Sequence, residues 1–260
     1  MNAELLLRFV LNCDRAYLFA HPERELTSDE HSRYQAALAE RARGVPAQYI
    51  TGHQEFWGMD LIVTPAVLIP RPETEHVLET VLEVQASAGA LRTDHLRIAD
   101  VGTGSGCIAL ALAKELPNAE IHATDSSPQA LEVARANAAR HQLERRIHFH
   151  HTDLLATLTP PFDFIVSNPP YVGESEEDQV QLEVRKFEPR SAVFGGATGT
   201  EVIARLIPQA RNLPRPGGAL VLEVSGTIAD QVLALLKGWD QPNVIPDLQQ
   251  IPRVIRARRP

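Results

Sequence analysis

The first fifty residues carry hydrophobic positions at helical spacing. Residues 3–12 place their apolar side chains on one face of a helix. Residues 27–44 open with the pattern of a capping box, in which Thr27 and Glu30 bond each other's backbone N–H groups, and they end at Gly44. This part of the chain is therefore predicted to be a small helical module.

The hydrophobic pattern changes between residues 54 and 69. Apolar and polar positions alternate there, β-branched and aromatic residues are frequent, and Gly58 supplies a turn signal, so we expect a β-hairpin. We divide the chain accordingly into a helical N-terminal domain over residues 1–52, a hairpin linker over 53–70 and a larger domain over 71–260.

From about residue 96 short apolar stretches alternate with amphipathic ones. The predicted strands are 96–101, 120–125, 146–153, 162–168, 219–224 and 252–259, and the predicted helices are 106–116, 126–141, 200–213 and 227–238. Strands that alternate with helices build a mostly parallel sheet covered on both faces. The larger domain is therefore predicted to be a doubly wound α/β fold.

Composition narrows the classes of function. The chain has 260 residues, 44% hydrophobic and 22% charged, with a formal net charge of −8, which disfavours a protein that coats nucleic acid. The N-terminal stretch has neither a basic leader nor a long apolar run, so a signal peptide and a membrane span are not supported. Cys13 and Cys107 form no metal or disulfide pattern. A cytoplasmic location fits these features.

A glycine-rich turn follows the first strand of the larger domain. Gly102, Gly104 and Gly106 lie between that strand and the next helix, where glycine lets a ligand approach the backbone. Asp125 ends the second strand, a position from which a carboxylate accepts the hydroxyls of a ribose. The glycines alone also fit a tight strand–helix turn, but together with Asp125 they favour a ligand that contains a nucleoside.

The spacing of the turn selects among nucleosides. It reads G-x-G-x-G, without the extra residue of dinucleotide sites and without the Lys-Ser/Thr pair of triphosphate sites. Asp100, just before the loop, would oppose a pyrophosphate but suits a cationic methionine group. This combination resembles the S-adenosylmethionine site of Rossmann-like methyltransferases. Asp153, after the third strand, would then lie near the adenine edge, although a solvated strand end is the alternative.

The fourth strand runs into Asn168-Pro169-Pro170-Tyr171, a rigid corner because proline fixes φ and lacks an N–H. An amide nitrogen is a poor nucleophile and must be held through its N–H bonds to attack a methyl group. The Asn168 side-chain oxygen and the Pro169 carbonyl can accept those hydrogens, Pro170 stiffens the frame, and Tyr171 offers its ring. A plain strand-ending turn explains the prolines but not their place opposite the glycine loop.

Several further motifs extend this picture over nearly the whole chain. "QEFWG" (54–58), "VLIPRPETE" (67–75) and "FEPRSAVFGG" (187–196), together with the Asn-Pro-Pro-Tyr corner, closely resemble the release factor glutamine methyltransferases, the PrmC/HemK family. The resemblance implies a seven-stranded Rossmann-like methyltransferase sheet preceded by a helical release-factor-binding domain. It also implies S-adenosyl-L-methionine as cofactor and, as substrate, the glutamine of the Gly-Gly-Gln motif of bacterial class 1 release factors.

The resemblance also implies roles for individual residues. The cofactor-binding residues would be Gly102, Thr103, Gly104, Ser105, Gly106, Asp125, Asp153, Leu154 and Asn168. The glutamine would be bound by Asn168, Pro169, Pro170 and Tyr171, with Arg71 and Glu73 closing the site over both ligands. A local ion pair is the alternative for Arg71 and Glu73, and Leu154 stands where many relatives have an aromatic residue.

Two other functions remain open from the residues. The corner motif also occurs in methyltransferases that act on the exocyclic amines of DNA or RNA, although the acidic composition disfavours direct binding of nucleic acid. The second open function is a cofactor-binding module that has lost catalysis. His148 and His150 share a strand face, but no carboxylate or cysteine stands at metal-ligand spacing, so no metal is expected. Which release factor is preferred, and the oligomeric state, do not follow from the sequence.

Overall fold

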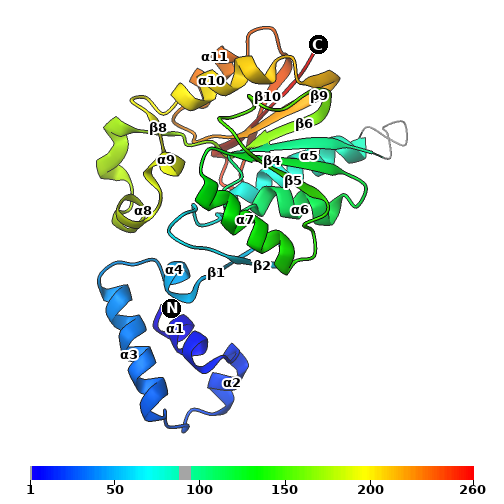
Figure 1. Ribbon diagram of the computed structural model, residues 1–260. Helices are drawn as coiled ribbons and strands as arrows, with labels where there is room; N and C mark the ends of the chain where they lie inside the picture. Colours follow the sequence, from blue (N-terminus) through cyan, green and yellow to red (C-terminus); the bar gives the residue numbers. More distant parts are fainter. Residues whose placement is uncertain (1, 88–94) are drawn as a thin grey trace.

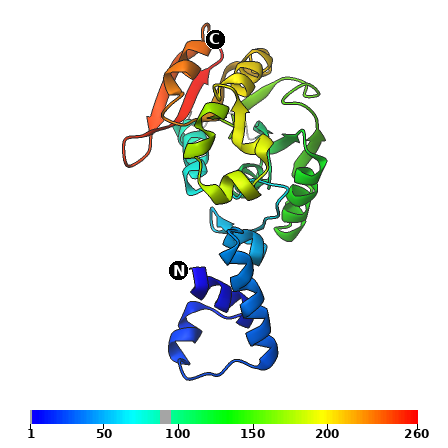
Figure 2. The ribbon, with the colours of Figure 1, turned by 90° about the vertical axis from the view of Figure 1, so that its left-hand side faces the viewer.

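The computed structural model describes residues 2–87 and 95–260, which form a small helical lobe and a larger α/β lobe (Figures 1 and 2). The helical lobe contains α1 (Asn2–Leu11), α2 (Arg15–Ala20), α3 (Ser28–Ala42) and α4 (Ala47–Thr51). The predicted capping box of α3 is confirmed: Thr27 Oγ1 accepts the Glu30 N–H at 3.2 Å, and the Glu30 carboxylate accepts the Thr27 N–H at 2.9 Å. No described helix is both long and apolar enough to cross a membrane.

The predicted hairpin joins the two lobes. Its strands β1 (His53–Phe56) and β2 (Met59–Ile62) pair antiparallel, and the chain turns at Trp57 and Gly58, which both have positive φ. The hairpin is fixed to the larger lobe by Asn137, whose side chain accepts the Ile62 N–H at 2.7 Å and donates to the Ile62 carbonyl at 2.9 Å. A buried amide that bonds both backbone groups of one residue holds the hairpin in register against the fold.

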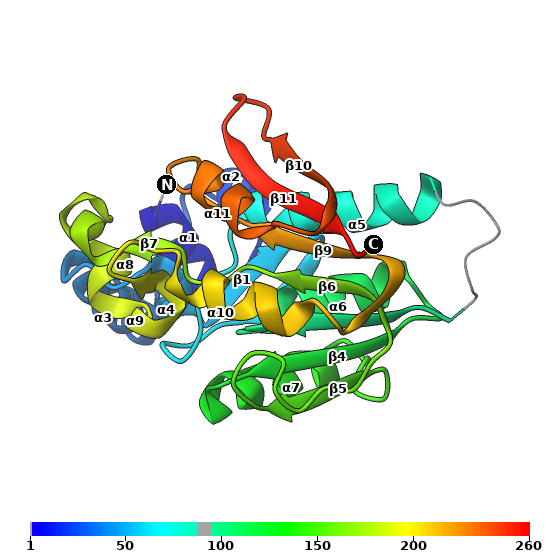
Figure 3. The ribbon, with the colours of Figure 1, turned by 90° about the horizontal axis from the view of Figure 1, so that it is seen from above.

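The larger lobe is built on a seven-stranded sheet. Its strands are β3 (Arg97–Val101), β4 (Glu120–Asp125), β5 (Ile147–His151), β6 (Phe162–Ser167), β9 (Pro214–Glu223), β10 (Asp240–Pro246) and β11 (Pro252–Arg258). Their order across the sheet is β10-β11-β9-β6-β3-β4-β5 (Figure 3). The five strands from β9 to β5 are parallel, whereas β11 pairs antiparallel with both β9 and β10. The predicted Rossmann-like methyltransferase fold is confirmed.

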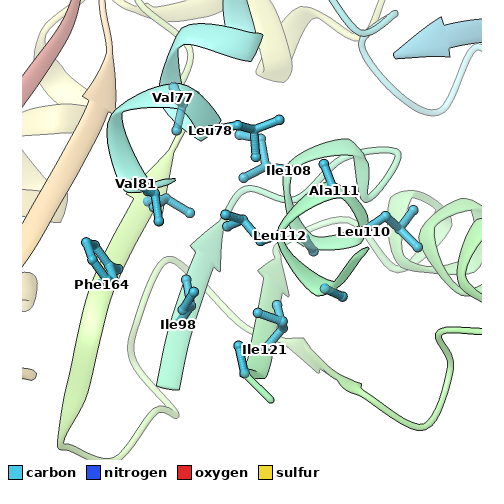
Figure 4. Close-up of a cluster of buried hydrophobic side chains, with 14 of the residues drawn as sticks. Val77, Leu78, Val81, Ile98, Ile108, Leu110, Ala111, Leu112, Ile121 and Phe164 are labelled. Atoms are coloured by element: carbon cyan, nitrogen blue, oxygen red, sulfur yellow. The ribbon is translucent and has the colours of Figure 1, made fainter. Parts of the chain in front are cut away.

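Helices cover both faces of the sheet. One core contains side chains of α5 (Glu75–Ser87), α6 (Cys107–Glu115) and α7 (Pro128–Arg140), and the other contains those of α10 (Glu201–Ala210) and α11 (Ala229–Leu235). Consecutive strand residues point to opposite faces, so Ile98 belongs to the first core and Ala99 to the second. Figure 4 shows the first core, where Val77 and Val81 of α5 lie over Ile98 and Phe164 of the sheet. Both faces are apolar because both are covered.

The structure adds a strand that the hydrophobic pattern did not indicate. β10 lies at the edge of the sheet, and most of its residues are exposed, so its sequence is polar and lacks the apolar alternation of a strand. Residues 215–218, between the predicted helix 200–213 and the predicted strand 219–224, lie inside β9, where the pairing with β6 is irregular. Helix α10 runs through Pro208.

A second addition is the segment from residue 172 to 196, which follows the Asn168–Tyr171 corner. It contains β7 (Val172–Gly173), η3 (Glu174–Gln179), α8 (Leu182–Phe187), α9 (Arg190–Val193) and β8 (Phe194–Gly196), and β7 pairs in parallel with β8. In Figures 1 and 2 these helices lie beside the sheet and above the helical lobe. The segment therefore faces the carboxyl ends of the parallel strands, where ligands bind in such sheets.

Two glycines let β8 and the next turn pack against the corner. A Cβ on Gly195 would lie 2.4 Å from the Pro170 carbonyl oxygen, and one on Gly199, whose φ is +85°, would lie 2.3 Å from the Tyr171 carbonyl oxygen. No side chain fits at either place, so backbone lies directly on backbone. The corner is thus rigid for two reasons: its own prolines and the strand packed behind it.

Candidate active site

Two cavities meet at the carboxyl ends of the parallel strands. The first, which we call the glycine-loop cavity, has a volume of about 370 Å³ and includes Gly102, Asp125 and Asp153 in its lining. The second, the interlobe cavity, has a volume of about 560 Å³ and lies between the helical lobe and the 172–196 segment. The residues that line both are Leu68, Arg71, Asn168 and Ala192. The two cavities therefore adjoin at these residues, Asn168 among them.

The glycine loop exposes its backbone to the first cavity. Gly102, Gly104 and Gly106 all have positive φ, which only glycine adopts without strain. A Cβ on Gly102 or Gly104 would meet no atom within 4 Å, so these residues border open space, whereas one on Gly106 would press on Ala134 and Leu110 at 3.2 Å. The first two glycines thus form a cradle for a ligand, and the third permits close packing of the helices.

Asp100 holds this loop in place through hydrogen bonds. Its side chain is fully buried, and it accepts a hydrogen bond from Thr103 Oγ1 at 2.6 Å and another from the Ala109 N–H at 3.2 Å. Burial raises the pKa of Asp100 to about 7, although both hydrogen bonds oppose the rise. Asp100 does not line the cavity, so it orders the loop rather than meeting a cationic ligand face to face. Thr103 and Ser105 line the cavity themselves.

Asp125 connects the end of β4 to the loop. One carboxylate oxygen accepts the Gly104 N–H and the other accepts the Ser127 N–H, both at 2.9 Å. Each oxygen has a second lone pair, and the carboxylate lines the cavity, so two hydroxyl groups of a ribose could still be accepted. Cavity, cradle and carboxylate together fit a nucleoside ligand.

We expect Asp125→Ala to weaken the binding of S-adenosylmethionine by tenfold or more, because hydrogen bonds to a charged group contribute roughly 1.5–3 kcal/mol each. Asp125→Asn is the matched control. It keeps one acceptor oxygen at the same place and should lose less affinity than alanine. Titration calorimetry measures both constants. Equal affinity for the wild type and Asp125→Ala would exclude Asp125 from the cofactor site.

The far edge of the same cavity is formed by Asp153 and Leu154. The Asp153 carboxylate forms an ion pair with Arg205 of α10, and all three residues line the cavity. Leu154 has a positive φ of 51° and packs against the second core. Asp153 is therefore present where the sequence places it, but it already has a cationic partner that sequence reasoning missed.

The Asn168–Tyr171 corner lies between the two cavities. Pro169 lines the interlobe cavity, Pro170 lines the glycine-loop cavity, and Asn168 lines both. The Asn168 side-chain NH₂ donates to Thr74 Oγ1 at 3.0 Å, so Thr74 bonds the nitrogen of this amide and not its oxygen. The Tyr171 hydroxyl donates to Glu223 at 3.2 Å, so its ring is fixed beside the interlobe cavity.

Arg71 and Glu73 have different surroundings. Arg71 pairs with Glu188, which is buried and also accepts the Ile69 N–H at 3.1 Å. The expected alternative, a local pair between Arg71 and Glu73, is not formed. Glu73 lines the interlobe cavity near Arg253 and makes no salt bridge with any of the described residues. The Arg71–Glu188 bond joins two motifs that are far apart in the sequence.

The other reactive side chains are inert or lie elsewhere. Burial raises the pKa of Cys107 to about 12, so its thiol stays protonated at neutral pH. His148 and His150 lie beside His122 on the sheet, with His122 Nδ1 at 3.0 Å from His150 Nε2. Within the described residues no group of three or more His, Cys, Asp or Glu side chains could hold a metal ion.

Two family models and several curated relatives match this chain. The family model described as the PrmC N-terminal domain matches residues 1–52, and the one described as the Methyltransferase small domain matches residues 83–186. The release factor glutamine methyltransferase of Koribacter versatilis (strain Ellin345) is 55% identical over 262 residues, which cover 100% of this chain and 91% of that protein. The enzyme of the same name from Chlorobaculum tepidum is 43% identical over 259 residues, which cover 97% of this chain and 88% of that protein.

The fold also resembles solved structures. The catalytic domain of hMettl16, determined in complex with the MAT2A 3'UTR hairpin 6, superposes with a TM-score of 0.60 over 94% of this chain and 92% of that one. The two sequences are 16% identical, so the likeness concerns the fold alone.

Proposed function

The chain belongs to the release factor glutamine methyltransferases, and we propose that its two joined cavities hold the methyl donor and the glutamine of the release factor side by side. It is an S-adenosyl-L-methionine-dependent protein-glutamine N-methyltransferase with a release factor as substrate. The observation that supports this arrangement best is that Asn168 lines both cavities.

The glycine-loop cavity is the proposed cofactor site. S-Adenosyl-L-methionine, when bound, supplies a methyl group on a positively charged sulfur. The backbone of Gly102 and Gly104 borders the open space for it, and Thr103 and Ser105 line the same wall. Asp125 would accept the ribose hydroxyls, while Asp153 and Leu154 would border the adenine. Gly106 allows the helix after the loop to pack closely enough to keep this cradle in shape.

The corner is the proposed substrate clamp. The Asn168 oxygen and the Pro169 carbonyl would accept the two hydrogens of the glutamine amide, which fixes the nitrogen and turns its lone pair toward the cofactor cavity. Pro170 and the backbone of Gly195 keep the frame rigid. Tyr171 offers a fixed aromatic ring to the planar amide. The amide loses its proton after it has gained the methyl group, so the clamp needs no strong base.

The finer identity of the substrate is also a proposal. We assign it to the Gly-Gly-Gln glutamine of bacterial class 1 release factors, because an interlobe cavity suits a peptide loop better than a duplex. Residues 1–52 would bind the body of the release factor, residues 53–70 would link the two domains, and residues 71–260 would catalyse the methyl transfer. The net charge of −8 supports a protein substrate over direct nucleic-acid binding, and a translation factor implies a cytoplasmic location.

Transfer of a labelled methyl group tests the proposal. The enzyme is incubated with labelled cofactor and a class 1 release factor, a variant of that factor with the Gly-Gly-Gln glutamine changed to alanine, or nucleic acid. We expect label only on the intact factor. Label on the alanine variant would place the modification elsewhere, and label on nucleic acid would establish an amine methyltransferase of that class instead.

A further inference from the structure

An arginine of the edge of the sheet lies on the wall of the interlobe cavity. Arg253 is near the start of β11, which begins where β9 ends because the two strands are antiparallel. Its carbonyl accepts the Val224 N–H at 2.8 Å, which fixes its backbone beside the end of β9. Arg253 lines the interlobe cavity together with Tyr171 of the clamp, and neither lines the glycine-loop cavity. Arg253 is therefore placed to meet the substrate and not the cofactor.

The Arg253 guanidinium is held from one side by Asp247. Its Nε donates to Asp247 Oδ2 at 2.9 Å. The other oxygen of Asp247 accepts the N–H groups of Gln249 at 2.8 Å and of Ile251 at 3.0 Å. Asp247 thus closes the turn between β10 and β11, and its side chain is only 11% exposed. The same carboxylate that shapes this turn orients the guanidinium.

This contact leaves both Nη groups of Arg253 for another partner. A guanidinium donates in one rigid plane, from Nε and from both Nη atoms, and it accepts nothing. Among the described residues the Nη groups form no hydrogen bond, and Glu73 on the same cavity wall forms no salt bridge with Arg253. The Arg253 side chain is 24% exposed and borders the cavity, so its remaining donors are available to a ligand there.

The proposed substrate limits which acceptors such donors can meet. Two glycines precede the glutamine in the Gly-Gly-Gln motif, and a glycine has no side chain. An enzyme can therefore form hydrogen bonds with these two residues only through their backbone N–H and C=O groups. Of the two, the carbonyl oxygen is the acceptor that a guanidinium can bind.

The position of Arg253 along the sheet edge fits this assignment. Asn168 follows β6, and β9 lies between β6 and β11 (Figure 3). Neighbouring strands are about 4.8 Å apart, so the Arg253 backbone lies about 10 Å along the edge from Asn168. An extended peptide covers about 3.4 Å per residue, so this distance corresponds to about three residues. A glutamine bound at the clamp places the glycines before it within reach of Arg253.

We propose that Arg253, oriented by Asp247, is a substrate-binding residue whose Nη groups donate to the backbone carbonyl oxygens of the two glycines in the Gly-Gly-Gln loop. The inference rests on the proposed function, which puts that loop in the interlobe cavity. Arg253 fixes the path of the backbone while Asn168 holds the side-chain amide. The contact is the same before and during methyl transfer, so it contributes to KM and not to kcat.

Arg253→Met tests this contact. The KM for release factor should rise about tenfold or more, because hydrogen bonds from a charged group are lost. Turnover at saturation and the affinity for S-adenosylmethionine should change by less than about threefold. Arg185→Met is the matched control and should leave KM unchanged. Arg185 pairs with Asp178 at 2.8 Å and its side chain is 30% exposed, much like Arg253, but it lines neither cavity.

Two milder substitutions test the orientation of the guanidinium. Asp247→Asn keeps an oxygen for the turn but places an NH₂ group beside the Nε–H of Arg253, so KM should rise, although by less than in Arg253→Met. Arg253→Lys keeps the positive charge, but one ammonium group cannot bond Asp247 and reach the glycine carbonyls together, so KM should stay raised. Both variants keep a polar pair in place and remain informative if Arg253→Met does not fold.

Short inhibitors identify the acceptor. The amidated tripeptide Gly-Gly-Gln carries the two glycine carbonyls, glutamine amide lacks them, and neither molecule has an acidic side chain. The tripeptide should inhibit methylation of release factor at a concentration about tenfold lower for the wild type than for Arg253→Met. Glutamine amide should inhibit both enzymes alike. Equal inhibition of the two enzymes by the tripeptide would overturn the assignment to the backbone of the loop.

Other outcomes would also overturn the inference: a wild-type KM for Arg253→Met or for Asp247→Asn, full recovery of KM by Arg253→Lys, or an equal rise of KM in Arg185→Met. In each of these cases the wild type still labels release factor, so the proposed function stands. A wild type that leaves release factor unlabelled would overturn the proposed function and this inference with it.

Discussion

Asn168→Ala should lose about 100-fold or more in turnover on release factor while the protein stays folded and keeps most of its cofactor affinity. The substitution removes the oxygen that would hold one hydrogen of the substrate amide, and with it the alignment of the nitrogen, which is worth several kcal/mol of the barrier in such reactions. Single-turnover rates with saturating release factor measure the loss, and titration calorimetry measures the cofactor affinity.

Two further variants make this result specific. Asn168→Asp keeps an acceptor in place but adds a negative charge that favours the cationic cofactor over the transition state, so its rate should fall between those of Asn and Ala. Ser167→Ala is the control for general damage at this place. Ser167 precedes Asn168, is buried and bonds the Val101 carbonyl at 2.7 Å, yet it lines neither cavity.

Ser167→Ala should cost about 1 kcal/mol of stability, the contribution of one buried hydrogen bond, and its turnover should stay within a few-fold of the wild type. Near-normal turnover of Asn168→Ala would reduce the Asn168–Tyr171 corner to a structural turn. A large loss for Ser167→Ala as well would show that the rate follows packing at the strand end rather than the amide of Asn168.

The sheet and the glycine loop could be predicted because each depends on neighbours in sequence. A parallel strand covered on both faces is a short apolar run, a helix has its own period, and a cradle for a ligand requires glycine where φ is positive. The position of Asp125 and Asn168 followed from the same logic, since both end parallel strands. The edge strand β10 escaped because exposure removes the apolar pattern on which the prediction depends.

The contacts in the site that the sequence did not predict are made between residues that are distant in sequence. Glu188, the partner of Arg71, is 117 residues away from it, and Asp153, in the loop after β5, pairs with Arg205 of α10. Only folding brings such residues together. A signal was nevertheless present at Glu223, a charged residue in the apolar strand 219–224, and at Asn137, a polar residue on the buried face of a helix. Glu223 accepts the Tyr171 hydroxyl, and Asn137 bonds the backbone of Ile62 and the carbonyl of Ser105 in the glycine loop.

Arg71→Met should be the most destabilising of the substitutions considered, at about 3 kcal/mol. Arg71 is the cationic partner of Glu188, whose side chain is only 1% exposed, and removal of one member of a buried pair leaves the other charge uncompensated. Arg71 itself is 31% exposed, which places the expected value at the lower end of the usual range. Urea denaturation monitored by circular dichroism gives the free energy of unfolding.

The chain offers a matched control in Arg41, which pairs with Glu183 at 3.0 Å and lines the same interlobe cavity. Both members of that pair are partly exposed, at 25% and 35%, so Arg41→Met should cost less than about 1 kcal/mol. The double variant Arg71→Met/Glu188→Gln is the second test. Glutamine can still accept the Ile69 N–H but carries no charge, so it should recover much of the stability that Arg71→Met alone loses.

Activity separates the structural role of Arg71 from its role in the site. If Arg71 also contacts the ligands, the double variant should regain stability but not turnover, because the guanidinium that borders both cavities is still missing. Recovery of turnover together with stability would show that Arg71 only ties residues 67–75 to residues 187–196. Equal losses of stability for Arg41→Met and Arg71→Met would contradict the argument from burial, since burial is what distinguishes the two pairs.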